Sequence, residues 1–145
     1  MITTFNDIIS KFKSFTEAHL QINDFGWGKP ESIQLKERLT PMVWLHPVPG
    51  SINGNITTLR FDMYVLSQME QDYSNLGTIF NDTLIIGNDT VANFWQDPDE
   101  EFGFTLNDER VNVTPFEGNF DILAAGWIFN IEITMVTTVC SVPTV

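Results

Sequence analysis

The longest regular alternation of apolar and polar residues lies in residues 124–139, near the end of the chain. Its apolar members occupy every second position: Trp127, Phe129, Ile131, Ile133 and Met135. A period of two residues is typical of a β-strand with one face in water. Residues 55–67 alternate in the same way. We therefore predict that these two segments are adjacent antiparallel strands at the centre of one sheet, with Phe61 and Trp127 buried.

Two other segments have apolar residues at helical spacing. A helix is expected over residues 4–21, where the apolar positions recur every three or four residues. A second helix is expected after Ser74, and it ends at Asp97-Pro98 because proline cannot continue a helix. Gly77 and Gly87 lie inside it, and each weakens a helix by about 1 kcal/mol relative to alanine. The sequence leaves open whether the helix breaks at Gly87.

Shorter segments complete the predicted sheet. Residues 42–47 form an apolar strand that should end at its prolines, and residues 47–54 are rich in turn-forming residues. Residues 102–106 and 110–114 are expected to pair as a hairpin, and a loop should cover 115–123. The order of elements predicts an α+β fold: one domain over residues 1–145, with an antiparallel sheet of about four to five strands and two helices packed on one face.

Composition limits the classes of partner. The chain has 19 acidic and 7 basic residues, which give a net charge of −12. Tight binding to nucleic acid requires clustered Lys and Arg, and binding to an anionic membrane surface requires the same, so both are disfavoured. No apolar stretch is long enough to span a membrane. Cys140 is the single cysteine, so no internal disulfide is expected, as in a reducing compartment.

The candidate chemistry of the sequence is sparse. The acidic run 97–108 suggests a calcium loop, but the required glycine is replaced by Phe102 and the required glutamate by Asp108. His19 and His46 lack the spacing of zinc ligands, and no nucleophile or phosphate-binding motif occurs. We therefore expect no enzyme, no metal and no cofactor. The alternative is a monomeric acidic accessory domain that binds a divalent cation or another ligand.

Short signatures run along nearly the whole chain. They are Thr4-Phe5, His19-Leu20-Gln21-Ile22, Ser74-Asn-Leu, Asn81-Asp82-Thr83-Leu84, Asp97-Pro98, Pro115-Phe116, Phe120-Asp121, Ala125-Gly126-Trp127 and Cys140-Ser-Val-Pro143. In these segments the sequence resembles small structural proteins of tailed bacteriophages, especially phages of Bacteroidetes, crAss-like phages included. The family is that of tail terminator and head–tail joining ring proteins. The resemblance implies a tail-terminator-like fold.

The resemblance also implies a function. The chain would form a hexameric or dodecameric ring in the neck or tail of the virion, after assembly in the host cytoplasm. It would contact portal, neck or tail proteins, and DNA would pass through the ring. Subunits this acidic should repel one another, so hydrophobic and strand-edge contacts would have to hold the ring together.

Two groups of residues are candidates for contact with other molecules. Loops carry many of the contacts in assemblies, and this argument selects Trp27, Val48, Ser51 and Asn53 as interface residues. A channel for DNA should repel phosphates rather than bind them. The residues expected to face the channel or a basic neighbouring protein are Asp97, Asp99, Glu100, Glu101, Asp108 and Glu109.

Overall fold

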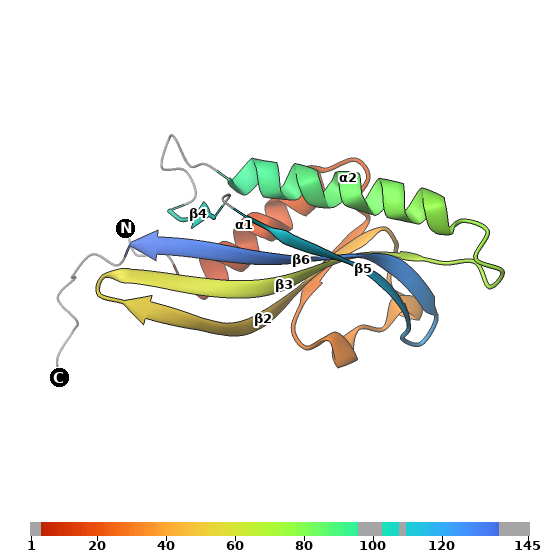
Figure 1. Cartoon of the computed structure of the whole chain (residues 1–145), viewed down its shortest axis with the longest axis horizontal. Coiled ribbons are helices and arrows are strands. Elements are labelled where there is room, and N and C mark those ends of the chain that lie inside the picture. The colour runs from red at the N-terminus through yellow and green to blue at the C-terminus, as the bar shows by residue number, and fades with distance from the viewer. Residues whose placement is uncertain (1–3, 96–102, 108–109, 137–145) are drawn as a thin grey trace.

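The computed structural model describes residues 4–95, 103–107 and 110–136 (Figure 1). It is an α+β fold with two α-helices, two short 3-10 helices and six strands. In chain order the elements are α1 (Phe5–Ala18), β1 (Asp24–Trp27), η1 (Pro30–Ser32), η2 (Leu35–Glu37), β2 (Met42–Asn53), β3 (Ile56–Gln68), α2 (Leu76–Phe94), β4 (Thr105–Leu106), β5 (Asn112–Asn119) and β6 (Leu123–Val136).

The centre of the sheet is the pair β3–β6. The two strands are antiparallel in unbroken register from Ile56 opposite Val136 to Gln68 opposite Ala124. This confirms the predicted central pair of strands. The strand order is β1-β2-β3-β6-β4, and β5 also pairs with β6.

The sheet is mixed, so the prediction of a purely antiparallel sheet of four to five strands is wrong. Asp24–Trp27 form β1, although Trp27 was selected as a loop residue, and β1 pairs with β2 in parallel, with Asp24 opposite Met42. A parallel neighbour needs a crossover connection of about a dozen residues or more. Residues 28–41, which contain η1 and η2, provide it.

Two strand ends predicted from prolines are wrong. β2 continues through Pro47 and Pro49 to Asn53, so residues 47–54 are mainly strand rather than a turn-rich loop. β5 likewise runs through Pro115, which was expected to begin a loop. Proline is tolerated in strands at the edge of a sheet, because no neighbour there needs its missing N–H. The expected hairpin over 102–114 is also wrong, since β4 and β5 both pair with β6.

The main core lies between one face of the sheet and both helices (Figure 1). Ile8 and Phe12 of α1 and Ile86 and Phe94 of α2 are fully buried there, and the rings of Phe12 and Phe94 stack at 4.2 Å. A smaller cluster covers part of the other face, beneath η1 and η2. It comprises Ile33, Leu35, Met42, Trp44, Leu66 and Ala124.

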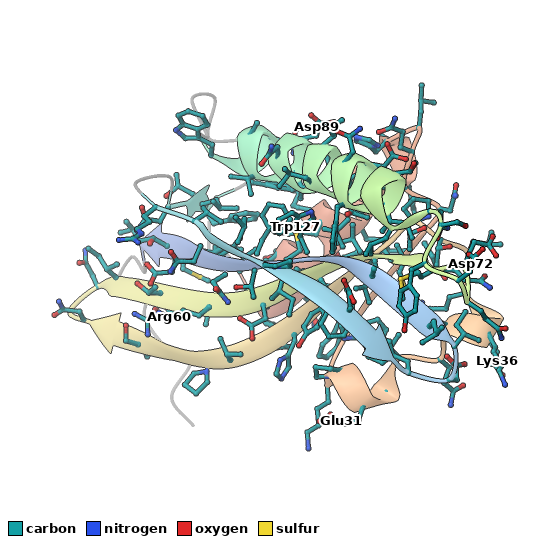
Figure 2. The ribbon with its side chains drawn as sticks, turned by 45° about the vertical axis from the view of Figure 1, so that its right-hand side comes forward. Glu31, Lys36, Arg60, Asp72, Asp89 and Trp127 are labelled. Atoms are coloured by element: carbon teal, nitrogen blue, oxygen red, sulfur yellow. The ribbon has the colours of Figure 1, made fainter. Side chains whose placement is uncertain are left out.

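The sequence predicted that Phe61 and Trp127 are buried, and the structure confirms this fully for Phe61 and partly for Trp127. Phe61 is 1% exposed. Trp127 is only half-buried: it lies between α2 and the sheet, and its Nε1 donates a hydrogen bond of 2.9 Å to the carbonyl oxygen of Phe80 (Figure 2). Its ring therefore joins the second helix to the central strand.

α2 is one unbroken helix, so the open question about Gly87 is settled. Gly87 is buried, and a Cβ placed on it would overlap the ring of Phe129 in β6. The glycine therefore allows α2 to approach the sheet closely, which offsets its weak helix propensity. α1 ends at Ala18, three residues before the predicted end at Gln21, and His19 is its C-cap.

Candidate assembly surface

The sheet extends beyond both helices as the hairpin of β2 and β3, beside the end of β6 (Figure 1). Three aliphatic side chains are exposed there: Ile52 by 76%, Ile56 by 41% and Val136 by 61%. Ile56 and Val136 are register partners, so their side chains lie next to each other on one face. This end of the sheet therefore presents apolar groups to solvent.

The sequence segments that form this end contain no charged residue. Residues 47–59 and 133–145 contain no Asp, Glu, Lys or Arg, although charged residues make up 18% of the chain. Pairing of β3 with β6 places residues 56–59 of the first stretch beside residues 133–136 of the second. We call residues 47–59 and 133–136 together the uncharged end.

The negative charge is concentrated in another part of the chain. Between Arg60 and Arg110 there are eleven acidic residues and no basic residue, so this segment supplies nearly all of the net charge of −12. Its described members outside the sheet lie on α2 and the turn before it (Figure 2). We call them the acidic flank: Glu70, Asp72, Asp82 and Asp89.

Local bonds fix two of the carboxylates on the acidic flank. The side chain and backbone N–H of Ser74 hold the pKa of Asp72 below its ordinary value, which favours the charged form. Asp89 lies 2.9 Å from Nε2 of His19, so it links α2 to the end of α1. His19 is thus hydrogen-bonded within the subunit.

The sheet face opposite the helices is polar between the uncharged end and the small cluster. Nε of Arg60 lies 2.9 Å from Glu132 across β3 and β6, and Nδ2 of Asn130 donates a 2.6 Å hydrogen bond to Asp62. Nδ1 of His46 is 3.9 Å from the same carboxylate. The charged side chains of this face therefore contact other side chains of the same subunit, and they are less available to bind a partner.

The two outermost long strands resist extension of the sheet. In the described part of the chain, no strand pairs with the outer side of β2 beyond Leu45, or with the outer side of β5. β2 carries Pro47 and Pro49 in this free region, and β5 carries Pro115. Proline on an edge strand removes N–H donors and blocks edge-to-edge pairing.

The predicted interface residues lie on two different strands of the structure. Val48, Ser51 and Asn53 all lie on β2 within the uncharged end, where Ser51 and Asn53 are exposed and Val48 is half-buried. Trp27 ends β1 and is 49% exposed, with its ring 5.1 Å from that of Phe5. The six acidic residues predicted for the channel, at 97, 99, 100, 101, 108 and 109, lie outside the described residues.

Two hollows of about 480 Å³ share Asp121 in their walls. One is also lined by residues within 30–34 of the crossover, and the other by residues at the end of β3. The carboxylate of Asp121 accepts the backbone N–H groups of Lys36 and Leu35, each at 2.9 Å, and these bonds hold the pKa of Asp121 low. Asp121 therefore anchors η2. Among the described residues, no group of three or more His, Cys, Asp or Glu side chains is placed to hold a metal ion.

No protein-family model and no curated protein matches the sequence. Within the described residues, no helix is both long enough and apolar enough to cross a membrane.

Sequence reasoning missed the aliphatic residues of the uncharged end and the separation of charge along the chain. Ile52, Ile56 and Val136 stand beside turn formers or near the end of the chain, and alternation alone does not show that they are exposed. The signal that could have found them is the absence of charged residues in two stretches that the predicted β3–β6 pairing brings together.

Proposed function

We propose that this chain is a structural subunit that assembles with copies of itself into a hexameric or dodecameric ring in the neck or tail of a tailed bacteriophage, and that DNA passes through this ring. Portal, neck or tail proteins are its neighbours in the virion, and assembly takes place in the host cytoplasm. Its role is structural rather than catalytic. The observation that carries the proposal is an exposed apolar end of the sheet whose own residues carry no charge, in a chain that has eleven acidic residues between Arg60 and Arg110.

The acidic segment suits a surface that DNA must pass without adhering. A basic lining would bind phosphates with a steep dependence on salt, whereas carboxylates repel them. In a ring, the eleven acids between Arg60 and Arg110 are repeated in every copy. We assign this segment to the channel or to a basic neighbouring protein.

The uncharged end suits contact between subunits. Copies that each carry a charge of −12 repel one another, and the residues of the uncharged end add no charge of their own to that repulsion. The exposed aliphatic side chains of that end supply a hydrophobic gain on burial. Contact through strand edges, which the sequence reasoning expected alongside hydrophobic contact, is disfavoured by Pro47, Pro49 and Pro115.

Electron microscopy and light scattering of the purified chain test the proposal. The expected result is a closed ring with a central opening and a mass that is a whole multiple of 16.5 kDa. Duplex DNA should not bind the ring at about 0.15 M salt, where the Debye length is about 8 Å. A particle without an opening, or one that binds duplex DNA tightly, would refute the assignment. A calorimetric titration with calcium separates the ring from a cation-binding domain, since the ring predicts no heat of binding.

A further inference from the structure

A closed ring needs two different surfaces on each subunit. If the same patch met itself on two copies, the contact would be satisfied in a dimer and could not propagate, whereas a head-to-tail contact closes into a ring. The uncharged end can supply only one of these surfaces. The inference below rests on the proposed ring and identifies the second surface.

We propose that the uncharged end of one copy docks on Trp27 of the next copy. The aliphatic side chains of Ile56 and Val136 supply one side of this contact, and the exposed indole of Trp27 supplies the other. The occupant of the uncharged end is thus a second copy of the chain, and the contact is head-to-tail.

The aromatic ring of Trp27, rather than exposure alone, selects it as the acceptor. Among the described residues, the exposed aromatic side chains are Trp27, Tyr73 and Trp95. Tyr73 directly follows Asp72, and Trp95 directly follows α2, which carries two carboxylates of the acidic flank, so approach of another acidic chain is opposed there. Trp27 lies outside that part of the chain, and tryptophan is enriched among the residues that dominate binding energy at interfaces.

The surroundings of Trp27 hold its ring in place. Phe5 of α1 contacts it edge-on, with centroids 5.1 Å apart, and Phe5 in turn stacks on the buried Phe61 at 6.0 Å. A ring supported in this way loses little freedom on docking. It lies at the end of β1, whereas Ile56 lies at the far end of the hairpin, so one subunit offers two separate apolar surfaces.

The charge distribution gives this contact a defined salt dependence. The docking surfaces are uncharged, but they bring two acidic chains together, so the remaining charges oppose association at low salt. Salt screens that repulsion, since the Debye length falls from about 30 Å at 0.01 M to about 3 Å at 1 M. Association should therefore strengthen as salt is raised, opposite to the behaviour of a contact held by ion pairs.

Complementation between two variants tests the contact. Ile56→Lys disrupts the uncharged end, and Trp27→Ala removes the indole on which that end docks. The added lysine lowers the net negative charge of the chain, so increased repulsion cannot explain a loss of assembly. Leu39→Lys is the matched control, because Leu39 is an aliphatic residue that is 70% exposed and belongs to neither surface. Circular dichroism melts check that each variant is folded, and Trp27→Phe keeps an aromatic ring where Trp27→Ala fails to fold.

Light scattering then measures the mass of each variant and of the mixture. We expect rings for the wild type and Leu39→Lys, and single chains for Ile56→Lys and Trp27→Ala. An equimolar mixture of the two damaged variants should form a mixed dimer of twice the 16.5 kDa chain mass, because one intact contact remains available. Rings from every variant would overturn the contact and leave the ring proposal standing. A monomeric wild type at all concentrations and salts would overturn both.

Discussion

Replacing Gly87 by alanine tests the close approach of α2 to the sheet. In an ordinary helix interior this change stabilises by about 1 kcal/mol. Here the new methyl group would overlap the ring of Phe129, which is 1% exposed and has no free space to enter. Overpacking of this kind costs about 1–3 kcal/mol. Because the ring is so tightly enclosed, the upper end of that range should apply, with a net loss of about 2 kcal/mol.

Gly77→Ala is the matched control in the same helix. A Cβ at Gly77 meets no atom within 4 Å, so only the helix propensity changes and stability should rise by up to about 1 kcal/mol. Urea unfolding followed by circular dichroism measures both changes, and a loss of 2 kcal/mol corresponds to a fall in Tm of roughly 7 °C. If Gly87→Ala were as stable as Gly77→Ala, the contact with Phe129 would not limit the helix position.

Three further predictions concern the core, the crossover and the acidic run. Phe61→Ala should lower the free energy of unfolding by about 3–5 kcal/mol, since the ring is fully buried in the central strand; an unchanged urea midpoint would exclude that role. The backbone N–H groups of η2 lower the pKa of Asp121 in the folded protein, so their stabilisation is present above the pKa of the unfolded chain and is lost as pH falls through the lower, folded value. Asp121→Asn should therefore flatten the loss of stability as pH falls below the ordinary aspartate pKa of 3.8, and an acid slope equal to that of the wild type would argue against it. Replacing Asp99, Glu100 and Glu101 together by lysine should leave the fold intact and impair particle assembly or passage of DNA, and normal particles that deliver DNA at the wild-type rate would assign this run to ordinary surface.

The central strands could be predicted from sequence because their pattern has one physical cause. A strand with one buried face must place apolar residues at every second position, and residues 124–139 and 55–67 both satisfy this over most of their length. The same reasoning located both helices. Their ends were less certain, as at Ala18, because side-chain spacing constrains the middle of a helix more strongly than its cap.

The outer strands could not be placed by local pattern. β1 has only four residues, and a glycine and a proline-containing loop follow it. Its membership of the sheet therefore depends on pairing with β2 rather than on its own sequence. Pro47 and Pro115 signal the end of a strand only if that strand is central. Whether a strand lies at the edge is a property of the whole sheet, and the local sequence does not specify it.

Only part of the proposed assembly surface could be predicted, because the rest depends on pairing between distant strands. Turn-forming composition pointed to residues 47–54, and these do lie in the uncharged end, although as strand rather than loop. Val136 could join them only once the register of β3 and β6 placed it opposite Ile56. Long-range pairing, not local composition, assembles this surface.

Hydrogen exchange in the dilute and the assembled protein tests most directly whether the uncharged end, and not the acidic flank, makes the contact between copies. We predict added protection on assembly in residues 50–57 and around Trp27, with no change along the exposed face of α2 that carries Asp82 and Asp89. Protection that appeared along α2 while residues 50–57 exchanged equally in both states would contradict the account.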